Sequence, residues 1–457
     1  MPATVNPMLL TDEEFEKYRY KNDQPADSAA FAILNFVDHA QVYRILGGLQ
    51  KNTDTVSFDE IKKLSYEAKG DPAQIEWLVN YMKNQIDKYF NDLTQFQFTP
   101  EEKECLHKAA IFFNLHMTEC TLALAVRSLL KQYAAFKSTN VLTFTQLLPK
   151  YPYRRIISTM QFVMDVMDPK AFEPEGCGIR SIQKLRLVHA LIRNRIERNT
   201  LEIKNAKKEN RLQDIKGEEW NDDWGVPINQ QDMIFAVHTF SIEVLHGLIA
   251  SGEKVSKEEM ENYYYAWHLI GKALGVRDEL NPTDYYTGYL VQNRIYKKEF
   301  IRDNPNGPVL AEPLIRFLVE VLPMAKRKGV LGLVKLFNDK KDYDPVFRDI
   351  LHIDLSEASR FYTSMYNLQD NFRHILINIK YFFLPNAKRS DYFRDIARNQ
   401  RKFFESIIGV AKTWTDSHFR IADAFGEQAA IQHEETAKQM PMWKRALKYF
   451  FPKWEIN

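Results

Sequence analysis

The chain of 457 residues carries 62 Lys and Arg against 60 Asp and Glu, which leaves a formal charge of +2. This balance provides no global field that would attract nucleic acid or an anionic membrane, so we expect no nucleic-acid partner. Hydrophobic residues make up 45% of the chain, enough to bury a core and line a pocket. Cys105, Cys120 and Cys177 show no Cys-x-x-Cys spacing, which argues against a disulfide framework and a cysteine-built zinc site and favours a reducing compartment.

The N-terminus has neither the basic region nor the apolar core of a signal peptide. No segment approaches the roughly 20 uninterrupted apolar residues that a membrane-spanning helix needs. We therefore expect a soluble, cytoplasmic protein, unless a leader has been removed from the chain.

Apolar residues recur at helical spacing along most of the chain, and alternating strand patterns are hard to find. The clearest helix start is Thr99-Pro100-Glu101-Glu102, which combines a capping residue, a proline in the first turn and two acids. The sequence therefore predicts an all-α protein. The predicted helices span residues 100–135 with one break, 153–167, 181–199, 229–252, 257–274, 284–302, 311–328, 356–380 and 391–412.

Composition changes near the two ends of the chain, which are more polar and more interrupted than the middle. We predict a single large helical domain with an N-terminal helical extension over residues 1–90, a core over 91–410 and a C-terminal helical tail over 411–457. The tail ends in MWKRALKYFFPKW, which mixes basic and aromatic residues. Such a segment either rests on a membrane surface or docks on the protein body, and docking is favoured.

One histidine lies in the middle of an apolar helix stripe. His189 has apolar neighbours at spacings of three and four residues, and Arg186 and Arg193 flank it on nearly the same face. The stripe consists of Ile182, Leu185, Ile192 and Ile196. Two guanidinium groups beside a buried imidazole need an anionic partner, and a haem would supply one, because its iron takes the imidazole and its propionates accept hydrogen bonds from arginine. A hydrogen-bonded core histidine remains the plain alternative.

The string R-x-x-H-x-x-x-R formed by these three residues is accompanied by further motifs. Upstream stands RRIIST, with Arg155 and Thr159. Downstream stand WGVPINQQD, which contains G-x-P-x-x-Q-x-D, and SKEEMENYYYAWHLIGKALG at residues 256–275. In this order the motifs resemble the latex clearing protein, or rubber oxygenase, superfamily, which also includes the oxygenase that shortens a farnesyl side chain in mycophenolic acid biosynthesis. The resemblance covers about residues 130–282.

The resemblance implies a globin-like helical core that binds one haem b, with His189 as the proximal iron ligand. Arg186 and Arg193 would then be outer-sphere or propionate contacts, and Arg155 and Thr159 would line the oxygen side. It further implies dioxygen-dependent oxidation of an apolar unsaturated substrate, an isoprenoid or lipid-like small molecule or polymer. Cleavage of a C=C bond is one form that this reaction takes in the family. A surface arginine and a capping threonine are the plain alternative for the Arg155 and Thr159 pair.

One position departs from the family pattern. Certain rubber oxygenases place a lysine, able to occupy the sixth iron position, where this chain has Ser158. A serine hydroxyl is too short and too weak a ligand for that role, so we expect a water-bound or five-coordinate resting site. The same departure puts polyisoprene in doubt as the substrate.

Two other readings remain open. Glu104-x-x-His107 and Glu243-x-x-His246 reproduce the Glu-x-x-His spacing of di-iron carboxylate proteins. The first pair, however, falls in an acidic and solvated helix start. A non-catalytic haem-binding protein on the same scaffold is the other reading. No P-loop, dinucleotide-binding or serine-hydrolase motif is present.

Overall fold

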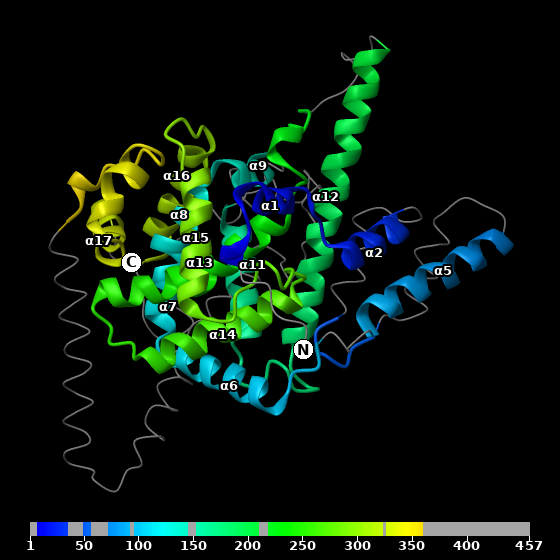
Figure 1. The fold of residues 1–457 in the computed structure, drawn as a ribbon, viewed down its shortest axis with the longest axis horizontal. Helices are drawn as coiled ribbons and strands as arrows, with labels where there is room; N and C mark the ends of the chain where they lie inside the picture. Colours follow the sequence, from blue (N-terminus) through cyan, green and yellow to red (C-terminus); the bar gives the residue numbers. More distant parts are fainter. Residues whose placement is uncertain are drawn as a thin grey trace, which may run out of the picture.

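The computed structural model describes residues 7–34, 49–55, 72–91, 96–144, 152–209, 218–322 and 326–359 (Figure 1). Within these ranges the chain is helical, and its one extended pairing is an isolated bridge between Ala135 and Phe300. The all-α prediction is confirmed. The α-helices are α1 (Asp12–Lys17), α2 (Gln24–Leu34), α5 (Pro72–Asn91), α6 (Pro100–Leu115), α7 (Met117–Ala123), α8 (Leu129–Ala134), α9 (Phe136–Phe144), α11 (Pro152–Val166), α12 (Gly178–Lys208), α13 (Gln230–Ser251), α14 (Lys257–Ala273), α15 (Tyr285–Glu299), α16 (Asn306–Val321) and α17 (Arg327–Phe337). Shorter 3-10 and π segments are η1 (Pro7–Leu9), η2 (Tyr18–Tyr20), η4 (Leu124–Ser128), η6 (Asp222–Trp224), η7 (Lys340–Asp342), η8 (Tyr343–Arg348) and η9 (Leu355–Glu357).

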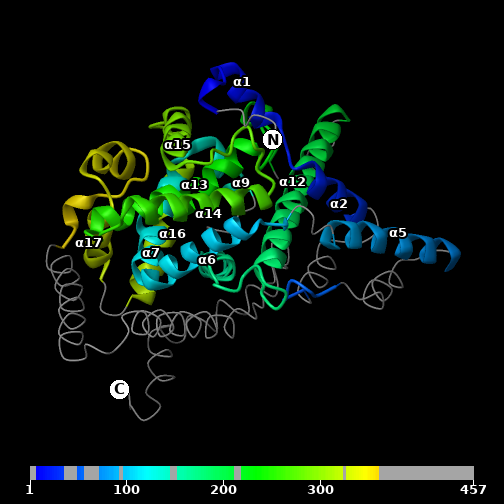
Figure 2. The ribbon, with the colours of Figure 1, turned by 60° about the horizontal axis from the view of Figure 1, so that its bottom comes forward.

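Helix α13 runs through the middle of the body, where α7, α14, α15 and α17 pack around it (Figures 1 and 2). The Asn229 side chain and Asp232 form a capping box at its start, and Gly252 ends it in the left-handed conformation with φ 102°. Among single helices of the described chain, α13 alone has the length and composition to cross a membrane. Because 72% of its apolar window is buried inside the protein, its composition is explained by its central position.

The predicted helix over residues 100–135 is broken at His116, where its two halves meet at 87°. Thr99 and Glu102 form the expected capping box at its start. The second half then contains the π-helix η4 before α8 begins. A π turn adds a residue to the helical period and so rotates the side chains that follow it.

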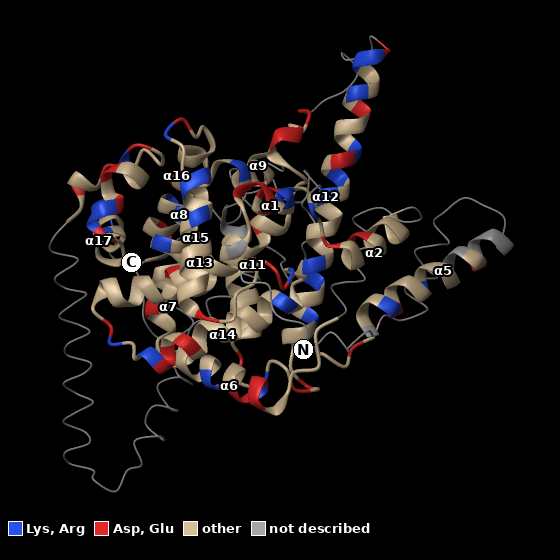
Figure 3. Cartoon of the chain, viewed as in Figure 1, with Lys and Arg blue, Asp and Glu red and all other residues tan. Residues whose placement is uncertain are grey.

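Helices α11 and α12 pack against each other on one side of α13. Helix α12 is longer than predicted, because it begins at Gly178 and continues through a charged stretch to Lys208. In Figure 3, the ribbon of its projecting end alternates between the colours of basic, acidic and other residues. No proline or glycine interrupts this stretch, which explains why the helix continues into solvent.

The N-terminal segment crosses the outside of α12, α13 and α15 before α2 packs between α12 and α5 (Figure 2). Its backbone is paired with the core: the amide of Val226 donates to the carbonyl of Arg19 at 3.0 Å, and the amide of Gln230 to that of Lys21 at 3.0 Å. The predicted helix over 391–412, most of that over 356–380 and the whole tail over 411–457 lie outside the described residues. The domain limits at 90 and 410 therefore stay predictions.

Candidate functional site

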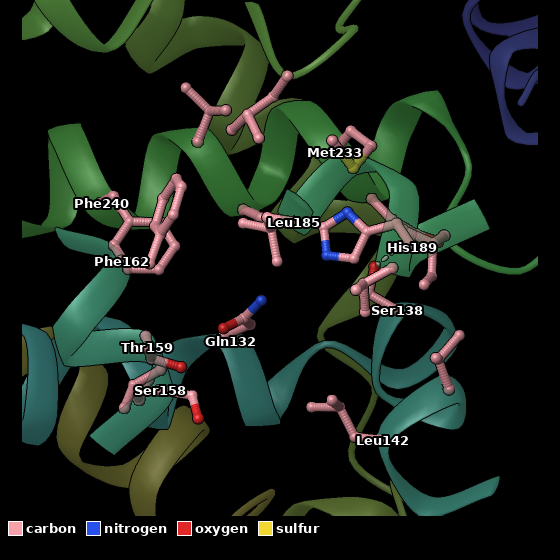
Figure 4. Close-up of a pocket in the computed structure, with 18 of the residues that line it drawn as sticks. Gln132, Ser138, Leu142, Ser158, Thr159, Phe162, Leu185, His189, Met233 and Phe240 are labelled. Carbon is pink, nitrogen blue, oxygen red and sulfur yellow. Dashed lines mark hydrogen bonds between the residues drawn. The ribbon is translucent and has the colours of Figure 1, made fainter. Parts of the chain in front are cut away.

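A cavity of about 180 Å³ lies between α8, α9, α11, α12, α13 and α14 (Figure 4). Its walls are mainly aliphatic and aromatic, with a few polar side chains. The lining residues are Leu129, Gln132, Tyr133, Ser138, Val141, Leu142, Ile156, Ser158, Thr159, Phe162, Leu185, Val188, His189, Ile192, Ile228, Asp232, Met233, Ala236, Val237, Phe240, Trp267 and Leu274. An apolar cavity with few polar groups is the usual form of a small-molecule site.

His189 brings an imidazole to one side of this cavity (Figure 4). Its helix neighbours Leu185 and Ile192, at four and three residues along the chain, line the cavity with it. The ring is half-buried and faces the cavity, as the predicted apolar stripe requires.

The hydroxyl groups of Ser158 and Thr159 lie across the cavity from His189, on α11 (Figure 4). Ile156 and Phe162 flank them on the same helix and complete this wall. Arg155 belongs to α11, but its side chain lies outside the described residues, so its expected position on the oxygen side stays a prediction.

Sequence reasoning missed three polar side chains of the cavity. Gln132 projects from α8, and Ser138 on α9 donates its Oγ hydrogen to Oδ1 of Asp232 at 2.6 Å. Burial raises the pKa of Asp232, while the Arg19 guanidinium, 3.6 Å away, acts in the opposite direction. Asp232 stood in the G-x-P-x-x-Q-x-D motif, which was a usable signal, whereas nothing in the sequence marked Gln132 or Ser138.

Arg186 and Arg193 lie away from the lining of the cavity and have partners elsewhere. Neither lines the cavity, and both are buried against α2 or its N-terminal approach. Arg186 binds Asp23 through Nε and through Nη2, the latter at 2.7 Å from Oδ1. Arg193 pairs with Asp27 and also donates to two backbone carbonyls before α13, at 2.8 Å each. Each arginine thus has an aspartate of the chain as its anionic partner in this structure, and its expected outer-sphere or propionate contact with a haem stays a prediction.

The segment that contains the cavity resembles a known catalytic domain. Residues 114–289 match the family model of the ER-bound oxygenase mpaB/B'/rubber oxygenase, catalytic domain, and every lining residue, from Leu129 to Leu274, falls within that range. The segment that holds the cavity is therefore similar to the catalytic domain of the rubber oxygenase superfamily.

Two relatives define how far the similarity extends. The rubber oxygenase of Streptomyces sp. (strain K30) is 24% identical over 170 residues, which are 36% of this chain and 37% of that protein. The chain thus spans little more than a third of that relative's length in the match. The structure of latex clearing protein LCP in the closed state shares the fold, with a TM-score of 0.53 and 17% identity over 85% of this chain and 91% of that one.

In the di-iron alternative, the Glu243 and His246 pair would have to bind iron, but both side chains already have partners in the protein. Glu243 is fully buried and accepts hydrogen bonds from Arg127 at 2.6 Å and Gln292 at 3.0 Å, with Lys131 at 3.2 Å. Although burial alone would raise the pKa of this carboxyl, the two cations hold it well below its usual range. Its neighbour His246 lies against Arg127 Nη2 at 3.5 Å. To bind a metal ion, this carboxylate would have to give up hydrogen bonds to buried cations, which would then be left without a partner.

The other pair of the di-iron alternative, Glu104 and His107, is equally unsuited to bind iron. Glu104 is mostly exposed and lies 3.8 Å from Lys108, while the exposed His107 ring faces the carbonyl of Pro169 at 3.3 Å. Among the described residues, no group of three or more His, Cys, Asp or Glu side chains is placed to hold a metal ion.

Proposed function

We propose that the cavity binds one haem b with His189 as the proximal ligand, and that the protein uses it with dioxygen to oxidise an apolar unsaturated substrate of isoprenoid or lipid-like kind. The observation that carries the proposal is a single imidazole in an apolar cavity, with hydroxyl groups on the opposite wall, inside the segment that matches an oxygenase catalytic domain.

The donor set suits a porphyrin better than a free metal ion. A haem iron needs one protein nitrogen, whereas a mononuclear metal site needs three or more protein ligands. The described residues of the lining include one imidazole, and the faces of a porphyrin would meet apolar walls such as Leu129, Phe162 and Phe240. No lysine or arginine occurs among the described lining residues, so the lining itself supplies no partner for propionates.

Cavity size adds a requirement to the proposal. A cavity of roughly 150 Å³ holds one benzene molecule, so about 180 Å³ is smaller than a porphyrin. Loading the haem therefore requires the lining helices to move apart. A cofactor that binds only the opened, folded state stabilises it by mass action, so the loaded protein should melt at a higher temperature than the haem-free protein.

Bound haem would supply the redox-active iron for oxygen chemistry. The chain's own residues hold and shield the reacting groups: His189 positions the cofactor, and the apolar walls exclude water. Ser158 and Thr159 provide hydrogen-bond donors opposite His189, and donors fixed in an apolar site stabilise negative charge that develops during a reaction. Since neither hydroxyl replaces a lysine as an iron ligand, the resting protein should show a water-bound or five-coordinate spectrum.

Two variants separate binding from turnover. His189→Ala should lose most of its haem, whereas Thr159→Ala should retain haem and lose oxygen uptake with short unsaturated isoprenoids by roughly a hundredfold. His107→Ala, an exposed histidine outside the cavity, serves as the matched control and should keep both properties. Stoichiometric haem in the His189 variant would refute the ligand assignment, and full oxygen uptake by the Thr159 variant would refute its role.

A further inference from the structure

The cavity contains one polar group, the side-chain amide of Gln132, that the proposed reaction does not use. Gln132 projects from α8, just after the π-helix η4, and Figure 4 shows its amide in the middle of the cavity, between His189 and Thr159. Within the described part of the chain, no side-chain hydrogen bond satisfies this amide. By contrast, the hydroxyl of Ser138 in the same cavity is already committed to Asp232 at 2.6 Å.

A primary amide in an apolar cavity discriminates between ligands. It offers two N–H donors and one carbonyl acceptor. A hydrocarbon that fills the cavity removes water from these groups and offers them no hydrogen bond. Its binding free energy is therefore weakened by the full cost of desolvating the amide. A ligand that carries a hydroxyl or carbonyl restores a hydrogen bond, and sites built in this way reject the analogue that lacks the polar group.

The charged residues of the lining also restrict which ligands the cavity can accept. Asp232 is the one carboxylate among the described lining residues, and no lysine or arginine accompanies it there. A substrate whose polar group is an anion would therefore meet a carboxyl and, among the described lining residues, no cation. A neutral polar group is the chemistry that both Gln132 and Asp232 accept.

We infer that Gln132 makes this cavity select unsaturated apolar molecules that carry one neutral hydroxyl or carbonyl group over the corresponding hydrocarbons. The inference rests on the proposed function for the reaction and names its substrate class: an oxygenated isoprenoid or lipid, not an all-hydrocarbon polymer. Gln132 acts as a specificity-determining residue, because its amide lines the same cavity as His189 and, once the helices have moved apart to admit the haem, would face a substrate bound beside it.

The test compares two probes that differ in one group. Prenol is an unsaturated alcohol with as many non-hydrogen atoms as benzene, and its partner is the hydrocarbon in which a methyl group replaces the hydroxyl. Affinities are measured on the purified full chain by saturation-transfer NMR titration, without oxygen turnover. The wild-type protein should bind prenol roughly threefold to tenfold more tightly than the hydrocarbon. In Gln132→Leu, which keeps the size and removes the amide, that ratio should fall to about one.

His107→Ala is the control, since it removes a polar ring that is exposed and does not line the cavity. It should leave the prenol-to-hydrocarbon ratio as in the wild type. The inference is overturned if Gln132→Leu keeps the wild-type ratio of affinities. It is equally overturned if the wild-type protein binds prenol and the hydrocarbon with the same affinity. The two proposals can fail separately. If Gln132→Leu loses selectivity but the protein carries no haem, the proposed function is refuted and this inference is supported.

Discussion

His238 and His246 are buried on α13, and burial lowers the pKa of His238 to about 3 and that of His246 to about 4. His238 is fully enclosed, with Nε2 3.5 Å from the hydroxyl of Tyr264. The Nε2 of His246 lies 2.5 Å from the hydroxyl of Tyr285. Both rings are therefore neutral in the folded protein at any pH above these values.

This burial makes stability depend on pH in a defined direction. In the unfolded chain a histidine takes up a proton below about pH 6.5, whereas the folded protein resists it. The unfolded state thus binds more protons between about pH 6.5 and the folded pKa, so stability falls as pH decreases through that window. Each histidine should contribute up to about 1.4 kcal/mol per pH unit.

Denaturant unfolding of His238→Gln at several pH values between about 5 and 7 tests this expectation, since glutamine cannot titrate. The slope of the free energy of unfolding against pH should become shallower than in the wild type. His107→Gln, at an exposed position, should leave that slope unchanged. A His238→Gln slope equal to that of the wild type would show that this ring is not a buried neutral group.

At the residue scale, the sequence predicted His189 correctly as a member of an apolar helix face that meets a cavity, because periodicity reports which face of a helix is buried. It could not assign the partners of Arg186, because Asp23 lies 163 residues away along the chain. It also missed Gln132, which follows a π turn that shifts the helical register, so its direction could not be read from spacing.

At the scale of elements, the approach to α2 and the middle of α12 are joined by a buried ion pair. Asp23 and Arg186 are both about nine-tenths buried, and Arg186 also donates to the carbonyl of Ala273 at 3.4 Å. This contact fixes α12, which carries His189, against the N-terminal segment. A complete buried ion pair has little net effect on the free energy of unfolding. Removing one partner is strongly destabilising, because it leaves the other charge buried and unpaired.

Asp23→Asn should therefore lower the free energy of unfolding by about 3–5 kcal/mol, because the Arg186 guanidinium stays buried without an anion. Combining it with Arg186→Met should recover most of the loss, since both charges are then removed. Denaturant unfolding of both variants measures the effect. Asp12→Asn breaks an exposed contact to Arg294 and should cause a much smaller change. If the single and double Asp23 variants were equally unstable, the ion pair would not be the cause.

Helix limits show what spacing can and cannot decide. The start of α13 at the Asn229 cap and its end at Gly252 follow from local signals, and the structure has both. The predicted helix over 311–328 instead proved to be the end of α16 and the start of α17, with α16 beginning earlier, at Asn306. Pro313 inside α16 is tolerated by packing that no local rule reports.

At the scale of the whole molecule, two hydrophobic clusters divide the described chain. The larger one contains α13 and α14, and the smaller one joins α2 and α5 to one face of α12. Helix α12 takes part in both, and its His189 faces the cavity between them and α11. The N-terminal segment, predicted as an extension, buries Arg19 against Glu299 and Gln231 and so is tied to the same body.

The central claim is that this body encloses one haem at His189. Pyridine haemochrome analysis of the full-length protein, purified from cells well supplied with porphyrin, measures it most directly. We expect the pyridine haemochrome spectrum of haem b and close to one haem per chain. A colourless, iron-free preparation under those conditions would contradict it.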